Sequence, residues 1–120
     1  MIFDWCITPF EIPFLKLELA WPPLVPRTHV EETDKEIIVY FEIPGVKKEE
    51  IELYASERTL RLRAKIPEEI RRRMWKPKEY RKTLVLTVPV DPEKATSKYE
   101  DGILRVVLPK KAPGRTIPIE

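Results

Sequence analysis

The chain contains no asparagine and no glutamine, and it has one cysteine and two methionines among its 120 residues. Side chains that degrade on heating are therefore scarce, while lysine, arginine and glutamate are abundant, which is typical of proteins from thermophiles. The single cysteine, Cys6, cannot close a disulfide within the chain. We expect a fold held together by packing, in a reducing, cytoplasmic setting.

Glycine is scarce as well, with only Gly45, Gly102 and Gly114. Phosphate-binding loops and dinucleotide-binding motifs need several glycines within a few residues, so nucleotide binding through these motifs is excluded. The chain also has only one histidine, His29, beside its one cysteine. Zinc sites and cysteine–histidine nucleophiles need such side chains close together, so the sequence predicts no enzyme, no metal and no cofactor.

Neither sign of charge dominates, because 22 basic and 20 acidic side chains leave a formal net charge of +2. So balanced a chain does not indicate nucleic-acid binding. No apolar run is long enough to span a membrane, and none follows a basic start as in a signal peptide. Hydrophobic residues make up 42% of the chain, which is enough for the core of one domain.

Thirteen prolines leave few windows that could hold a helix of ordinary length. The segments between them have the alternation of strands instead. Residues 59–66 place leucine, alanine and isoleucine on one face and basic side chains on the other, and residues 51–55 alternate too. Asp101 and Gly102 predict a two-residue hairpin turn, since both positions of a type I′ turn need a positive φ.

About seven short strands are expected between residues 26 and 109. They are residues 28–33, 36–43, 51–55, 59–66, 83–88, 96–100 and 103–108. Residues 36–43 and 83–88 are apolar on both faces or nearly so, which predicts two central strands. This spacing, without intervening helical patterns, predicts an all-β fold, an immunoglobulin-like antiparallel two-sheet β-sandwich.

Three segments do not fit inside this sandwich. Residues 1–26 form an aromatic arm, in which residues 13–21 fit a helix or a strand equally well. Residues 67–78 are a connection with large apolar side chains, and a long connection in a compact domain is usually functional or disordered. The tail, residues 110–120, ends in two isoleucines separated by Pro118, which holds that part of the chain extended.

The tail and the long connection each have two interpretations. Ile117 and Ile119 project from the same side of an extended chain, as a two-pronged apolar plug, or they belong to a frayed end. Residues 67–82 carry seven basic and three acidic side chains. Such a stretch follows a nucleic-acid backbone in some proteins, but it is more often a solvated or subunit-pairing surface.

Four short motifs, in this order, resemble the small heat-shock proteins, which carry an α-crystallin domain. The motifs are residues 43–51 (IPGVKKEEI), 90–95 (VDPEKA), 99–104 (YEDGIL) and 117–119 (IPI). Together with the composition, they resemble the archaeal, thermophilic type. The resemblance implies three parts, namely an N-terminal arm (1–26), an α-crystallin domain (27–109) and a C-terminal extension with the Ile-Pro-Ile motif (110–120).

The resemblance also implies an ATP-independent holding chaperone that forms a dimer, assembles into a larger homo-oligomer and binds unfolded client proteins. In the archaeal branch a strand of the long connection crosses to the partner subunit, which makes Ile70, Met74 and Trp75 interface residues. The aromatic side chains of the arm would contact clients and other arms, or would complete the core of their own domain. These side chains are Phe3, Trp5, Phe10, Phe14 and Trp21.

The terminal plug, Ile117, Pro118 and Ile119, would dock in a neighbouring subunit between residues 51–55 and residues 95–98. The expected walls of that groove are Leu53, Ala55 and Thr96. An alternative within the same fold is a co-chaperone module of the p23 type that binds a larger chaperone as a monomer, although the plug argues against it. A nucleic-acid-binding β module using residues 67–82 is a weaker alternative.

Overall fold

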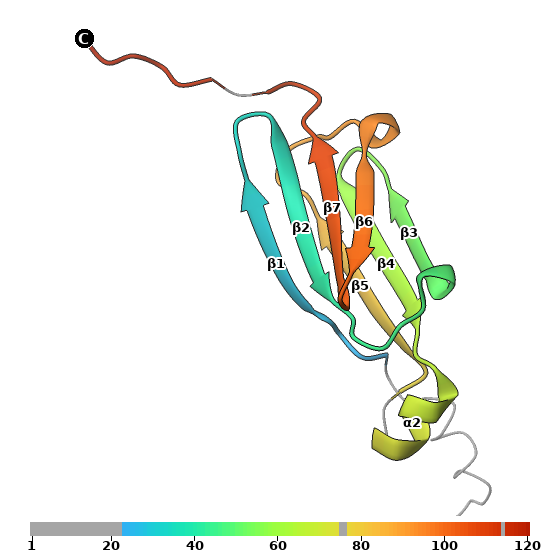
Figure 1. Ribbon diagram of the computed structural model, residues 1–120. Coiled ribbons are helices and arrows are strands. Elements are labelled where there is room, and N and C mark those ends of the chain that lie inside the picture. The colour runs from blue at the N-terminus through green and yellow to red at the C-terminus, as the bar shows by residue number, and fades with distance from the viewer. Residues whose placement is uncertain (1–22, 75–76, 114) are drawn as a thin grey trace, which may run out of the picture.

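The computed structural model describes residues 23–74, 77–113 and 115–120. Their strands and helices are β1 (Arg27–Glu32), β2 (Glu36–Glu42), the 3-10 helix η1 (Lys48–Glu50), β3 (Ile51–Ala55), β4 (Thr59–Lys65), α2 (Glu68–Met74), β5 (Glu79–Val85), the 3-10 helix η2 (Pro92–Lys94), β6 (Thr96–Glu100) and β7 (Ile103–Pro109). Two antiparallel sheets, in the orders β1-β2-β7-β6 and β3-β4-β5, pack as layers (Figure 1). The predicted two-sheet β-sandwich is confirmed.

The core lies between the two sheets and follows from the alternation in the sequence. On β4, Leu60, Leu62 and Ala64 are buried, whereas the basic side chains between them are exposed, as predicted. On β2, Val39 and Phe41 are fully buried and meet the inner face of the other sheet. Burying a side chain of this size contributes about 1.5–3 kcal/mol, so these few positions supply much of the stability.

One strand lies elsewhere in its sheet than the sequence suggested. The central position of β2, between β1 and β7, agrees with the prediction, but the central position predicted for residues 83–88 is wrong. The strand there is β5, which is at the edge of its sheet and leaves Val85 79% exposed. The apolar run misleads because Leu86 turns out of the strand, is buried in the core, and donates its N–H to the carbonyl of Arg58 at 2.7 Å.

The predicted hairpin turn joins β6 to β7. Asp101 and Gly102 have φ values of 52° and 80°, in the region that a type I′ turn requires. The carbonyl of Gly102 accepts a hydrogen bond from the N–H of Ile43, at 2.8 Å. A Cβ atom at position 102 would lie 3.1 Å from Cα of Pro44, so the glycine also permits the close approach of the two loops.

Tyr99 on β6 ties that strand to the same loop. Its hydroxyl donates to the carbonyl of Val46 at 2.7 Å and lies 3.0 Å from the carbonyl of Ile43. Burial raises the pKa of the phenol, and the nearby Tyr80 raises it further. The hydrogen bond to Val46 lowers this pKa but does not outweigh the other two effects. Tyr99 therefore stays neutral and fastens the lower end of β6 to the connection between the sheets.

The connection between β4 and β5 contains a helix, so the strand expected within residues 67–78 is wrong for the single chain. Glu68–Met74 form α2, whose first turn is acidic and whose last turn is basic, in the sense that the helix dipole favours. The carbonyl of Pro67 accepts from the N–H groups of Ile70 and Arg71, at 3.1 and 3.0 Å. The segment between Pro67 and Pro77 is just long enough for two turns of a helix.

The first described residues pair with the edge of β5. Leu24 forms a parallel bridge with Tyr80, in which the N–H of Leu24 donates to the carbonyl of Glu79, and the N–H of Arg81 donates to Leu24, both at 2.9 Å. The rest of the predicted arm, residues 1–22 with its aromatic side chains, lies outside the described residues. The choice between helix and strand for residues 13–21 therefore stays open.

Candidate functional site

The C-terminal tail leaves the sandwich at the end of β7 and extends away from it (Figure 1). None of residues 112–113 and 115–120 forms a hydrogen bond or an ion pair within the described part of the chain. Ile117 is 78% exposed and Ile119 is 97% exposed. Two large apolar side chains thus stand free of their own sandwich, at the positions where the sequence predicts a plug.

The predicted docking groove corresponds to one side of the sandwich, where β3 and β6 are the edge strands of opposite sheets (Figure 1). Leu53 pairs with Leu62, and Ala55 pairs with Leu60, so both face the interior. Both are only partly buried, because no strand covers them beyond the edge. This strip of inner face, the β3–β6 edge, is apolar and accessible.

Thr96 does not face this strip. The register pairs Thr96 with Val107 and the next residue, Ser97, with the buried Val106. Because side chains alternate along a strand, Ser97 lies on the inner face and Thr96 on the outer face. We therefore correct the groove residue to Ser97. Counting back from the Asp101–Gly102 turn to the partner of Val106 would have identified it in the sequence.

The residues expected to cross to the partner subunit, Ile70, Met74 and Trp75, are only partly described by the structure. Ile70 on α2 is half-buried against the core of its own domain, where a Cβ atom at position 45 would lie 2.5 Å from its Cδ1. Gly45 has φ +85° and makes room for this contact. The side chain of Met74, and Trp75 as a whole, lie outside what is described. In the single chain the loop therefore packs on its own sandwich through Ile70.

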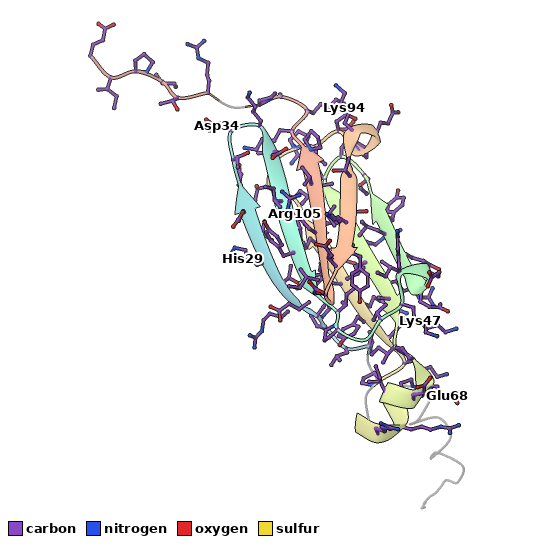
Figure 2. The ribbon with its side chains drawn as sticks, viewed as in Figure 1. His29, Asp34, Lys47, Glu68, Lys94 and Arg105 are labelled. Atoms are coloured by element: carbon purple, nitrogen blue, oxygen red, sulfur yellow. The ribbon has the colours of Figure 1, made fainter. Side chains whose placement is uncertain are left out.

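The basic stretch of residues 67–82 is partly neutralised by neighbouring carboxylates. Arg72 pairs with Glu68 at 2.8 Å on α2, which lies at the foot of the sandwich (Figure 2). Glu79 pairs with Arg81 and, at 2.9 Å, with Arg63. These pairs give the weaker, nucleic-acid interpretation less support, since paired guanidinium groups are less available to phosphates.

Glu79 is also a titratable group with a shifted pKa. Burial raises the pKa of this carboxyl, but the hydrogen bonds and charges of Arg63 and Arg81 outweigh burial and hold it below the ordinary value of 4.5. A carboxyl whose pKa is lowered by folding stabilises the protein above that ordinary value. The stabilisation is lost as the pH falls through the lowered pKa.

Replacing Glu79 by glutamine is therefore expected to destabilise the protein at neutral pH and to matter little in acid. At pH 7 the variant loses two charge-assisted hydrogen bonds, and we expect its free energy of unfolding to fall by about 1 kcal/mol. As the pH falls through the lowered pKa of Glu79, the wild-type carboxyl is itself protonated, so the difference is expected to be smaller at pH 3 than at pH 7. Urea unfolding followed by circular dichroism at both pH values measures the effect.

The matched control is E49Q, which removes an exposed carboxylate that forms no ion pair with another described residue. It should change the unfolding free energy by less than about 0.5 kcal/mol at either pH. An E79Q difference of the same size at pH 7 and pH 3 would contradict the ionic role of Glu79.

Within the described ranges, no helix is long and apolar enough to cross a membrane. The same residues contain no cluster of three or more histidine, cysteine, aspartate or glutamate side chains able to hold a metal ion. His29 is exposed on β1, as Figure 2 shows, and its Nε2 lies 3.5 Å from Oε2 of Glu31.

The two-sheet fold that carries this tail matches a known class of protein. The model of the Hsp20/alpha crystallin family matches residues 29–120. The chain therefore belongs to the Hsp20/alpha-crystallin family of small heat-shock proteins. Proteins of this family are chaperones and not enzymes, which supports a chaperone role.

Individual relatives agree with this assignment. The chain is 26% identical over 104 residues to small heat shock protein C2 of Rickettsia felis, which covers 81% of this chain and 68% of that protein. It is 26% identical over 95 residues to a 15 kDa heat shock protein of Leptospira interrogans, covering 75% of this chain and 73% of that protein. These relatives are bacterial, so the archaeal, thermophilic type is not supported.

A solved structure shows the same fold. Heat shock protein 16.0 from Schizosaccharomyces pombe superposes with a TM-score of 0.69 at 24% sequence identity, over 81% of this chain and 99% of that chain. At this level of identity the likeness concerns the fold alone.

Proposed function

We propose that the chain is an ATP-independent holding chaperone that works as a dimer-based homo-oligomer and binds unfolding proteins before they aggregate. The observation that carries the proposal is the pair of exposed isoleucines, Ile117 and Ile119, on a tail that forms no hydrogen bond with its own β3–β6 edge among the described residues. Family membership supports the chaperone role. A cytoplasmic location belongs to the proposal, since a single cysteine suits a reducing compartment.

In this proposal the tail of one subunit docks on the β3–β6 edge of another. Ile117 and Ile119 lie against Leu53, Ala55 and Ser97, with Pro118 keeping the chain extended between them. Burying two isoleucines contributes about 3–6 kcal/mol before the cost of ordering the tail is subtracted. Each contact is weak and reversible by itself, but many such contacts linked in one assembly hold it together.

The same apolar surfaces explain how a client is captured. At low temperature sister subunits occupy the β3–β6 edges and shelter the aromatic side chains of the arm. Heating loosens these contacts, and exposed apolar segments of an unfolding protein take the place of the tail or the arm. No step requires ATP. The dimer contact is proposed to involve the connection that carries Met74 and Trp75.

Suppression of client aggregation on heating tests the proposal. Citrate synthase heated with an equal number of chain subunits, without nucleotide, should scatter markedly less light than citrate synthase alone. Bovine serum albumin at the same mass concentration is the control for simple crowding. Equal turbidity in the two mixtures, or protection that depends on added ATP, would overturn the holding role.

The p23-type alternative has one observation in its favour, the packing of Ile70 on its own domain, because a monomeric module needs no swapped loop. It leaves the two exposed isoleucines without a role. Light scattering separates the alternatives, since a co-chaperone module of this type is a monomer at concentrations where an assembling chaperone is not.

A further inference from the structure

The root of the tail, Pro109, Lys110 and Lys111, is fixed at the upper end of the sandwich. The N–H of Lys110 donates to the carbonyl of Lys35 in the β1–β2 hairpin, at 2.8 Å. The N–H of Lys111 donates to the carbonyl of Pro89, at 3.0 Å, on the connection that follows β5. The chain therefore leaves from between one loop of each sheet, at the end where Asp34 and Lys94 lie (Figure 2).

The side chains of Lys110 and Lys111 also contact different sheets. Nζ of Lys110 lies 2.7 Å from Oε2 of Glu32 at the end of β1, and the Lys110 side chain is only 8% exposed. A buried ammonium group is costly unless a carboxylate accompanies it. Lys110 thereby directs the root toward β1, on the side of the sandwich away from the β3–β6 edge.

Lys111 reaches the other sheet. Its Nζ lies 2.8 Å from Oε2 of Glu57, in the hairpin between β3 and β4. The hydrogen bond and the charge of Lys111 hold the pKa of Glu57 below its ordinary value, and the pKa of Lys111 is raised in turn. Both groups are thus charged near neutral pH, and the pair spans the gap between the tail and that hairpin.

The length of the tail alone does not prevent it from docking on its own subunit. Glu57 comes two residues after Ala55, so the root lies close to the upper end of its own β3. The six residues from Lys111 to Ile117 span about 20 Å when extended, and β3, with five residues, is about 17 Å long. The direction of the tail, rather than its reach, decides which edge it meets.

In the structure that direction is away from the chain's own β3–β6 edge. The tail passes the β1–β2 hairpin and continues outward, while β3 and β6 lie on the opposite side of the sandwich (Figure 1). Pro113 disfavours a helical turn at Ala112, so the chain cannot easily reverse immediately after the root.

We propose that Lys110 and Lys111 are positioning residues, which aim the tail outward so that Ile117 and Ile119 dock on a second copy of the chain and not on their own β3–β6 edge. This inference rests on the proposed docking of the tail. It assigns the choice between docking within a subunit and docking between subunits to two ion pairs, Lys110 with Glu32 and Lys111 with Glu57.

Charge reversal at the exposed pair tests the inference without disturbing the core. K111E is expected to shift the assembly toward smaller species in size-exclusion chromatography with light scattering, because a root tied only through Lys110 no longer has one fixed direction, and its tail can swing back to its own edge. E57K should cause the same shift. The double variant E57K/K111E restores the pair with reversed polarity and should restore the wild-type mass. Urea midpoints verify that each variant is folded.

The distance from the tail to its own edge supplies a second readout, which a purely structural role would not move. Spin labels at E120C and K98C in a C6S background, diluted with unlabelled subunits, should show long distances in the wild-type root. With K111E a short-distance population should appear and should vanish again in E57K/K111E. Masses and distances that stay unchanged in K111E and in E57K would overturn the inference.

A chain ending at Thr116 separates this failure from failure of the proposed function. If that chain loses its large assemblies while the root variants keep theirs, tail docking stands and the role of the root falls. If it keeps its large assemblies, tail docking itself fails, and the inference about the root fails with it.

Discussion

A chain that ends at Thr116 is expected to lose its large assemblies and to elute as a dimer or a monomer. The truncation removes Ile117 and Ile119, which are exposed in the single chain, so the sandwich loses no internal contact. Each lost docking contact is worth a few kcal/mol before ordering costs, and the assembly depends on many of them at once. Size-exclusion chromatography with multi-angle light scattering measures the mass.

The matched control is a chain that lacks only Glu120, which keeps the plug and should keep the wild-type mass. The chain ending at Thr116 should still unfold in one cooperative urea transition, which verifies that its sandwich is folded. Equal masses for the full chain and the chain ending at Thr116 would contradict docking through the tail.

The substitution Phe41→Ala is expected to bring the sandwich close to unfolding at room temperature. Phe41 is fully buried on the inner face of β2, between the two sheets. Removing such a ring costs about 3–5 kcal/mol, through lost burial and the cavity that remains. This loss is a large part of the free energy of unfolding of an ordinary domain, about 5–15 kcal/mol. Urea unfolding followed by circular dichroism measures the loss.

Val85→Ala is the control for Phe41→Ala, because it also shortens an apolar side chain on a strand, but one that is 79% exposed. Its effect should stay below about 0.5 kcal/mol. The subunit concentration must be equal in all samples, since assembly contributes to apparent stability. Similar losses for the two variants would contradict the placement of the core between the sheets.

The features that could be predicted from the sequence are those with a local cause. The alternation of residues 59–66 predicts the buried face of β4, because side chains of any strand alternate between its two faces. Asp101 and Gly102 predict the hairpin because the turn demands a positive φ at both positions. The exposed isoleucines of the tail, Ile117 and Ile119, also follow from a local pattern, while their role as a plug stays a prediction.

The features that the sequence did not reveal depend on distant parts of the chain. Whether β5 is central or at an edge depends on which strands pair with it, and its own apolar residues carry no such information. The short α2 is stabilised by Gly45, which accommodates Ile70 from another loop. The partners of Lys110 and Lys111 are 78 and 54 residues away, so nothing near the lysines identifies them.

The groove shows an intermediate case. The inward facing of Leu53 and Ala55 could be predicted because the strand that carries them alternates clearly, while their role as groove walls stays a prediction. Thr96 was assigned wrongly, since residues 96–100 have no apolar alternation of their own and their facing is set only by pairing with β7. A register counted from the hairpin turn would have moved the assignment by one residue, to Ser97.

The hydrogen bonds of Tyr99 make the two ends of the β3–β6 edge unequal. At the lower end, Tyr99 of β6 donates its hydroxyl proton to Val46 in the connection that leads to β3, a hydrogen bond worth about 1 kcal/mol. At the upper end, near Ala55, no comparable bond between described residues spans the two strands. We therefore expect β6 to separate from β3 more readily at the upper end of this edge than at the lower end.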